Sequence, residues 1–261
     1  MALDIDLTDM RVLVTGGGSG IGRCIAETMA ACGARVAICD AAPAALEDMK
    51  AANPQIARYA CDVSDEAQVN ALFDAVAKDF GGLDVMVNNA GITGPFGAIE
   101  TLATADWVKT FAVNVHGMFF CTRRAVPLLK AAGKGLIINL SSITGRLGYA
   151  LRTPYSASKW AVIGLTESLA IELGPSKIRV NALLPGFVAG PRHERNAHAR
   201  AALLGITYEE QKRRIMSKIS MRELTQPQDV ANMALFLASP LGAHISGQSI
   251  SVCGNVETLG G

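Results

Sequence analysis

The sequence predicts a doubly wound α/β fold, in which seven parallel strands form one sheet with helices on both faces. Three observations predict it. Short apolar runs alternate with segments of helical length along the chain, which is typical of βαβ units. A glycine-rich turn follows the first apolar run. Half of the 261 residues are hydrophobic, which is enough for the core of one large domain.

The strands are predicted from apolar, often β-branched runs bounded by polar residues or glycine. They cover residues 11–15, 35–40, 56–61, 84–88, 136–140, 178–184 and 249–252. The predicted helices cover residues 20–32, 43–52, 65–80, 107–129, 154–173 and 228–238. Pro43 fits a first helical turn, Ser64 is the expected N-cap of the third helix, and a kink is expected near Gly117.

The alternating pattern has one exception, residues 187–222, which are polar, basic and without a regular period. No Pro-, Gly- or Ser-rich linker divides the chain, so we expect one domain over residues 1–261. Open α/β sheets bind ligands beyond the carboxyl ends of their strands, and this segment follows such an end. We therefore predict that residues 187–222 form a substrate lid.

Composition argues against several classes of protein. The net charge of +1 argues against a nucleic-acid-binding surface, and no run of 18 apolar residues suggests a membrane span. The six cysteines include no Cys-x-x-Cys pair and no histidine at metal-ligand spacing, so we expect reduced thiols and no metal. Residues 1–10 lack the basic start of a signal peptide. These features together predict a cytoplasmic protein.

The glycine-rich turn reads Thr-Gly-Gly-Gly-Ser-Gly-Ile-Gly over residues 15–22. Glycines there let the backbone approach a pyrophosphate at the N-terminus of the next helix. The position between a strand and a helix favours dinucleotide binding over a merely flexible turn. Asp40 ends the second strand, where a carboxylate accepts hydrogen bonds from ribose hydroxyls and repels a 2′-phosphate, which favours NAD over NADP. The expected cofactor contacts of the turn are Gly16, Ser19, Gly20, Ile21 and Gly22.

Tyr155 and Lys159 lie four residues apart and share one face of a predicted helix. A free phenol has a pKa of about 10 and is a poor proton carrier at neutral pH. A nearby ammonium favours the phenolate and lowers that pKa toward the working range. Beside a dinucleotide site, this pair predicts hydride chemistry on a carbonyl or an alcohol. The alternative is a surface pair without chemistry.

Taken in order, the motifs resemble the short-chain dehydrogenase/reductase family over essentially the whole chain. The resemblance rests on residues 15–22, the run Asn88-Asn89-Ala90-Gly91, and Asn114, Ser142, Tyr155-x-x-x-Lys159 and Pro185-Gly186. It implies a Rossmann-type sheet. It also implies that Tyr155 is the general acid/base, that Lys159 lowers its pKa and holds the nicotinamide ribose, and that no metal is needed. Ser142 would bind the substrate oxygen, and Asn114 would hold a water of a proton relay.

The resemblance implies further contacts with the cofactor. They involve Asp62, Val63, Asn89, Ala90, Gly91, Pro185, Gly186 and Val188, in addition to Tyr155 and Lys159. Asp62 would contact adenine through its carboxylate and Val63 through its backbone. Val188 would offer backbone groups to the carboxamide. The chain departs from the family at Gly190, where threonine is frequent, so no binding role is carried onto Gly190.

The substrate end is less determined by the sequence. Arg152 lies three residues before Tyr155 and could dock a carboxylate, sulfonate or phosphate through paired hydrogen bonds. Arg192 and Arg195 could close from the lid, and Tyr149 and His193 could line the pocket. In the alternative, Arg152 pairs with a carboxylate or another subunit, and the substrate is a neutral sugar, polyol or 3-oxoacyl compound. More remote alternatives are a catalytically silent NAD-binding regulator and a non-redox enzyme of the same fold.

The helix predicted over residues 154–173 is apolar on more than one side, with Trp160, Ile163, Leu165 and Leu169. Such a helix must be covered both by its own sheet and by another body. The family is usually dimeric or tetrameric through this helix and the one before it. We therefore expect a homotetramer, or else a homodimer.

Overall fold

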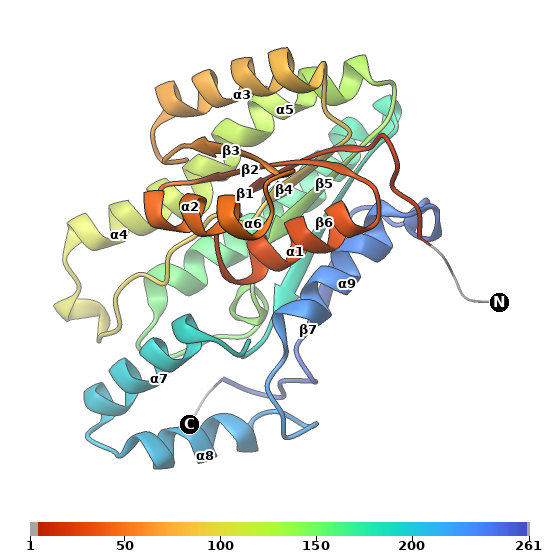
Figure 1. The fold of residues 1–261 in the computed structure, drawn as a ribbon. Coiled ribbons are helices and arrows are strands. Elements are labelled where there is room, and N and C mark those ends of the chain that lie inside the picture. Colours follow the sequence, from red (N-terminus) through yellow and green to blue (C-terminus); the bar gives the residue numbers. More distant parts are fainter. Residues whose placement is uncertain (1–4, 260–261) are drawn as a thin grey trace.

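Seven parallel strands form one sheet in the order β3-β2-β1-β4-β5-β6-β7 (Figure 1). The structure is a computed structural model that describes residues 5–259, so the first four residues of the N-terminal segment interpreted above lie outside it. The strands are β1 (Arg11–Thr15), β2 (Arg35–Asp40), β3 (Ala57–Ala60), β4 (Val85–Asn88), β5 (Gly135–Leu140), β6 (Ile178–Pro185) and β7 (Ser249–Val252). The predicted fold is confirmed. Because the chain order reverses between β1 and β4, the ligand crevice of such a sheet lies at their carboxyl ends.

Helices cover both faces of the sheet. One face carries α1 (Gly20–Ala31), α2 (Pro43–Ala52) and α9 (Pro227–Ala238). The other carries α3 (Glu66–Phe80), α5 (Gly117–Ala131) and α6 (Thr153–Leu173). Successive side chains along each strand point to opposite faces of the sheet, so the same strands contribute to the hydrophobic core on each face.

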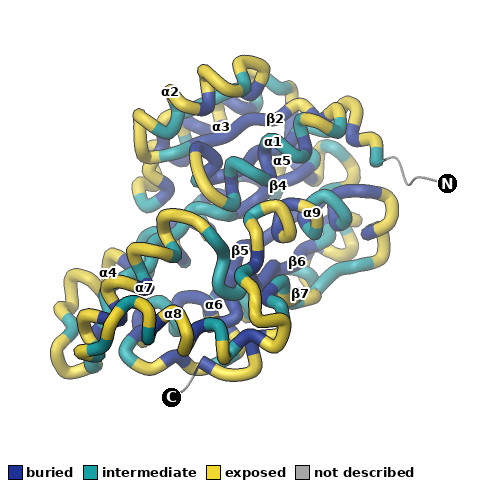
Figure 2. The backbone as a smooth tube through the Cα atoms, turned by 60° about the horizontal axis from the view of Figure 1, so that its bottom comes forward, coloured by how far each residue is buried: buried dark blue, intermediate teal, exposed yellow. Residues whose placement is uncertain are grey.

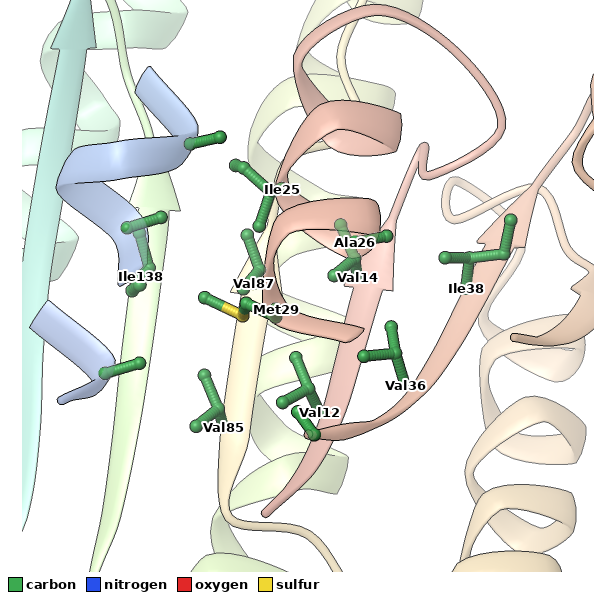
Figure 3. Close-up of a cluster of buried hydrophobic side chains, with 14 of the residues drawn as sticks. Val12, Val14, Ile25, Ala26, Met29, Val36, Ile38, Val85, Val87 and Ile138 are labelled. Atoms are coloured by element: carbon green, nitrogen blue, oxygen red, sulfur yellow. The ribbon is translucent and has the colours of Figure 1, made fainter. Parts of the chain in front are cut away.

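Strand β1 shows how one short run serves the two cores. Val12 and Val14 pack under α1 with Ile25 and Met29 (Figure 3), whereas Leu13 belongs to the core on the opposite face. A strand that is buried on both faces has a continuous apolar sequence, which is why β1 could be predicted from the sequence.

The long helix predicted over residues 107–129 is interrupted. It begins earlier, as α4 (Thr104–Phe111), passes through a five-residue π-helical segment, η2 (Ala112–His116), and continues as α5. The expected irregularity near Gly117 is therefore a π segment that ends just before that glycine. A side chain at Gly117 would come within 2.7 Å of Val63. The π-helical segment therefore ends where the helix backbone packs closely against Val63. Segments of this kind often mark functional positions, and this one holds Asn114.

The prediction that residues 187–222 are irregular is wrong. The segment contains two helices, α7 (Pro191–Leu204) and α8 (Tyr208–Ser217), which lie outside the main layers (Figures 1 and 2). Pro191 occupies the first turn of α7, and Gly205 ends that helix at a φ of 64°. Thr207 caps α8, since its Oγ1 accepts a hydrogen bond from the Glu210 amide at 3.1 Å.

Smaller differences concern termini and composition. The N-cap of α3 is Asp65 rather than Ser64, because the Asp65 carboxylate accepts hydrogen bonds from the amides of residues 67 and 68. Within residues 5–259, every cysteine is free, no helix is both long and apolar enough to cross a bilayer, and no His, Cys, Asp and Glu side chains group as a metal site would require.

Candidate active site

A cavity of about 850 Å³ opens at the carboxyl ends of the strands. The glycine-rich turn and the segments after β2, β4, β5 and β6 form its walls, and α7 and α8 contribute its outer side. It brings together all of the predicted cofactor, substrate and catalytic residues except Gly22 and Asn114, which do not line it. Positions spread over most of the chain therefore meet in one space.

The turn before α1 is shaped for close approach of a ligand to the backbone. Gly16 has a φ of 60°, and a side chain at Gly22 would lie 2.3 Å from both the Asn89 amide nitrogen and the Gly16 carbonyl oxygen. Ser19 is the N-cap of α1, yet its side chain makes no capping hydrogen bond. Its hydroxyl and the first amides of the helix are therefore available to a phosphate. These residues fit a dinucleotide.

Asn89 holds this turn in place. Its side-chain amide donates to the carbonyl oxygens of Thr15 and Gly16, both at 2.9 Å, and its backbone amide donates to Thr15 Oγ1 at 3.0 Å. The Ala90 amide donates to the same hydroxyl at 3.0 Å. Thr15 thus links β1 to the end of β4. This role of Thr15 was not predicted from the sequence, although the residue is part of the motif.

Asp40 lies at the opposite side of the turn. Its Oδ2 accepts a hydrogen bond from the Gly18 amide and its Oδ1 from the Ala42 amide, both at 3.0 Å. A carboxylate oxygen accepts more than one hydrogen bond, so this fixed carboxylate can also receive ribose hydroxyls. Asp62 is held similarly, because its Oδ1 accepts from the amide and the hydroxyl of Ser64 at 2.9 and 2.7 Å. Both carboxylates line the cavity.

Tyr155 lies in the first turn of α6, where its phenol reaches the cavity. Burial raises the pKa of this phenol, but nearby positive charges and a hydrogen bond with Ser142 outweigh burial and lower the pKa to about 8. The charges are those of Lys159, Arg192 and Arg152. A phenol with this pKa exchanges protons near neutral pH.

Lys159 is almost fully buried, and its Nζ donates to the Leu140 carbonyl oxygen at 2.7 Å. Burial lowers the pKa of its ammonium group. Ser142 follows β5, and its Oγ accepts a hydrogen bond from the Thr144 amide at 3.2 Å. Each of these side chains has one backbone partner and retains further hydrogen-bonding capacity on the side of the cavity.

Asn114 is fully buried in the π segment. Its Oδ1 accepts from the Ile92 amide at 2.8 Å, and its Nδ2 donates to the Ile92 carbonyl oxygen at 3.1 Å and to Ser158 Oγ at 3.0 Å. Both amide hydrogens are therefore used. A side chain at Gly91 would meet Asn114 Oδ1 at 3.1 Å and Lys159 Nζ at 3.6 Å, so the amide oxygen and the ammonium lie near each other.

The segment after β6 presents its backbone to the cavity. Val188 forms a parallel bridge with Thr225, in which the hydrogen bonds use the Phe187 carbonyl and the Ala189 amide. The N–H and C=O groups of Val188 itself point away from Thr225 and remain available. Gly190 has a φ of 133°, a conformation in which a threonine would be strained. The departure from the family at this position therefore has a conformational reason.

The substrate end is lined by aromatic rings and arginines. The guanidinium of Arg152 lies 4.1 Å from the ring centre of Tyr155 and 4.9 Å from that of Phe96. Arg200 of α7 stacks on Tyr149 at 4.3 Å and donates to the Ala150 carbonyl oxygen at 2.9 Å. Neither Phe96 nor Arg200 was predicted from the sequence to reach this site.

The remaining predicted substrate residues also belong to this end. Arg192 Nε donates to Thr93 Oγ1 at 3.2 Å, which connects α7 to the segment after β4. His193 packs edge-on against Phe187 with ring centres 6.1 Å apart, and burial lowers its pKa. Arg192 and Arg200 are eight residues apart, a spacing that places both on one side of a helix. Recognising α7 in the sequence would have pointed to Arg200.

Comparisons with known proteins identify the family of the chain. Residues 16–255 match the protein family described as enoyl-(acyl carrier protein) reductase. The (3R)-3-hydroxyacyl-CoA dehydrogenase of Rattus norvegicus is 37% identical, over 98% of this chain and 99% of its own length.

Solved structures are similar as well. The crystal structure of an NAD⁺-bound xylitol dehydrogenase matches with a TM-score of 0.92 at 28% identity, covering 95% of this chain and 99% of the other. The 3-ketoacyl-(acyl-carrier-protein) reductase from Brucella melitensis, complexed with NADH, matches with a TM-score of 0.85 at 32% identity over 95% and 98% of the two chains. The chain belongs to the short-chain dehydrogenase/reductase family and is an oxidoreductase that acts on CH–OH groups.

Proposed function

We propose that this protein is an NAD-dependent enzyme that interconverts a secondary alcohol and a ketone. The observation that carries the proposal is the phenol of Tyr155, whose pKa is lowered to about 8 and which shares one cavity with a dinucleotide-binding turn. The names of relatives and neighbours support it, since they include a hydroxyacyl-CoA dehydrogenase and structures that contain NAD⁺ or NADH.

The roles of the residues follow from their positions. Bound NAD would accept a hydride from the alcohol carbon, or NADH would return it to the ketone. During oxidation the Tyr155 phenolate removes the hydroxyl proton, and during reduction the phenol returns it. Ser142 hydrogen-bonds the substrate oxygen and stabilises its developing charge. The positive charge of Lys159 stabilises the phenolate, and its remaining N–H groups donate hydrogen bonds to the nicotinamide ribose.

A proton released at Tyr155 must reach solvent. We assign this step to a water beside Lys159 that Asn114 holds. Because both Asn114 amide hydrogens bind protein groups, the water would bind the free lone pair of Oδ1 or the backbone carbonyl of the π segment. The π segment would therefore serve catalysis by placing this oxygen near the ammonium.

The cofactor is assigned as NAD rather than NADP because Asp40 projects a fixed carboxylate where the adenosine ribose would lie. We expect NADH to bind at least about tenfold more tightly than NADPH, since a 2′-phosphate would be repelled. Asp40→Ala should reduce this preference by weakening NADH binding more than NADPH binding. Fluorescence titration of each nucleotide measures it without turnover. Equal affinities for the two nucleotides in the wild type would contradict the assignment.

For the substrate, two candidates have support. An anionic hydroxy or keto compound is favoured by Arg152, and a neutral sugar, polyol or 3-oxoacyl compound is favoured by the names of the neighbours. A screen of NAD reduction with hydroxy acids, hydroxy sulfonates, polyols, sugars and steroids tests the function as a whole. Tight NADH binding without turnover of any compound would instead indicate a catalytically silent regulator.

The remaining assignments concern the molecule as a whole. We assign residues 187–222, with α7 and α8, as the substrate lid of a one-domain chain, because these helices form the outer wall of the cavity. We also assign a cytoplasmic location and a homotetramer. Support for the oligomer comes from Trp160 of α6 and Phe119 of α5, which are 53% and 46% exposed.

A further inference from the structure

Arg152 is a buried cation for which residues 5–259 supply no carboxylate partner. Only 9% of the residue is exposed, and its Nε is buried and finds no hydrogen-bond acceptor within residues 5–259. The rings of Phe96, Tyr149 and Tyr155 surround the guanidinium. An aromatic ring attracts a cation but cannot replace an acceptor for each N–H group. Burying an unpaired charge costs free energy, and a bound anion would offset this cost. The arrangement therefore indicates an anion-binding site.

The charges around Arg152 do not compensate for its own. The charges that act on it belong to two tyrosines and to Arg192 and Arg200, and no carboxylate among the described residues is one of them. The cavity as a whole is lined by several cations: Lys109, Arg152, Lys159, Arg192, Arg195 and Arg200. The carboxylates of its described lining are those of Asp40, which accepts from the Gly18 amide of the glycine-rich turn, and of Asp62, which follows β3. The substrate end is therefore electropositive.

The phosphates of the nucleotide do not account for this charge. They have their own site at the glycine-rich turn and the N-terminus of α1. Arg152 instead packs on the ring of Tyr155, the residue that faces the reacting alcohol. An anion that Arg152 binds would therefore belong to the substrate.

We propose that Arg152 binds an anionic group of the substrate, so that the enzyme acts on a short hydroxy or keto compound bearing a carboxylate, sulfonate or phosphonate. This inference rests on the proposed function and narrows it. The planar guanidinium presents paired N–H groups that match two oxygens of such an anion. Arg200 supports the site by holding the Ala150 carbonyl of the same loop. Arg192, in the lid, contributes further positive charge.

A different role for Arg152 predicts different kinetics. If its charge served only to favour the Tyr155 phenolate, its removal would affect charged and uncharged substrates alike. If it binds an anion, the loss falls on KM for the charged substrate. Matched pairs of substrates separate the two roles, because they differ in charge and little in shape.

The experiment compares 3-hydroxybutanoate with 3-hydroxybutanamide and 2-hydroxypropane-1-sulfonate with the corresponding methyl sulfone, each with NAD. For the wild type we expect kcat/KM at least about 10²-fold higher for the anion of one pair or both, in line with hydrogen bonds to a charged group. Arg152→Met should remove most of this preference by raising KM for the anion, and Arg152→Lys should keep part of it. Arg213→Met, a change of an exposed arginine of α8 that does not line the cavity, should leave the preference intact.

A binding measurement complements the kinetics. Isothermal titration of the protein–NADH complex with propane-1-sulfonate or butanoate should give heat that Arg152→Met abolishes and Arg213→Met retains. Similar kcat/KM values within both pairs, or equal losses for charged and uncharged members in Arg152→Met, would overturn the anion site while leaving the dehydrogenase intact. Absence of turnover with every alcohol, together with anion binding that depends on Arg152, would overturn the proposed function and keep the anion site.

Discussion

Three positive charges of the site, those of Lys159, Arg192 and Arg152, act on the phenol of Tyr155. Burial alone would make its phenol a weaker acid, yet the cations beside it lower the pKa to about 8, and Lys159 is foremost among them. Alcohol oxidation requires the phenolate, whereas ketone reduction requires the phenol. The direction of the shift therefore sets the direction of the pH dependence.

We predict that kcat/KM for alcohol oxidation rises with pH and levels off above an inflection near 8. Lys159→Met removes the leading positive charge, so the inflection should move up toward about 10, the value of a free phenol. Initial rates at saturating NAD between pH 6 and 11 measure the shift (the range brackets both values, as a phenol titration requires). Arg195→Gln, which alters a lid arginine that does not act on Tyr155, is the control and should leave the inflection in place. An inflection that stays near 8 in Lys159→Met would contradict the role of the ammonium.

At single residues, the sequence predicted what depends on local spacing. Tyr155 and Lys159 share a helix face because they are four residues apart, and Asp40 ends a strand. The local sequence was therefore enough to predict where these side chains lie. Phe96 and Arg200 could not be placed in this way, because each reaches the cavity from an element whose docking depends on tertiary packing. The hydrogen bonds that the Asn114 side-chain amide donates to Ile92 and Ser158 could not be predicted from the sequence either.

Among the elements, the glycine-rich turn and α1 are the most constrained. A methyl group at Gly22 would lie 2.3 Å from Asn89 Nδ2 and from the Gly16 carbonyl, which leaves it no space. We predict that Gly22→Ala displaces Asn89, lowers the free energy of unfolding by about 1–3 kcal/mol and weakens NADH binding. Denaturant unfolding and NADH fluorescence measure the two effects.

The control for this prediction is Gly164→Ala. Gly164 lies inside α6, and nothing beyond its chain neighbours and the backbone of its own helix lies within 4 Å of a methyl group built there. This change should leave the stability and NADH binding near those of the wild type. If Gly22→Ala behaved in the same way, the turn would be more adaptable than its geometry implies.

The helices α7 and α8 show why one set of elements was not predicted from the sequence. α7 and α8 are polar on most sides, so their apolar period is weak and their burial rests on a few positions such as Ala197 and Ile215. Their ends were nevertheless encoded: Pro191 in a first turn, Gly205 at a C-terminus, and Thr207 followed three residues later by Glu210. Where hydrophobic periodicity is faint, such end signals locate a helix better.

At the scale of the whole molecule, the parallel sheet followed from alternation of strands and helices, because crossover connections leave few topologies. The position of the cavity followed as well, since open sheets bind ligands at the point where strand order reverses. How α7 and α8 close this cavity did not follow, because it depends on contacts with the segment around Tyr149 and with the C-terminal residues.

We predict that the protein is a homotetramer assembled through α5 and α6. Phe119 and Trp160 are large apolar side chains that remain about half exposed on those helices. Trp160→Glu combined with Phe119→Glu should yield smaller species in light scattering coupled to size exclusion. Leu203→Glu, a change at a similarly exposed leucine of α7, should leave the assembly unchanged. A monomeric wild type, or a double variant that stays tetrameric, would contradict this surface.

The central claim is that the Tyr155 hydroxyl carries the proton of the reaction. The most direct test is kcat of Tyr155→Phe, which keeps the ring against Arg152 and removes only the hydroxyl. We predict a fall of at least about 10²-fold with NADH binding unchanged. Turnover close to that of the wild type would contradict it.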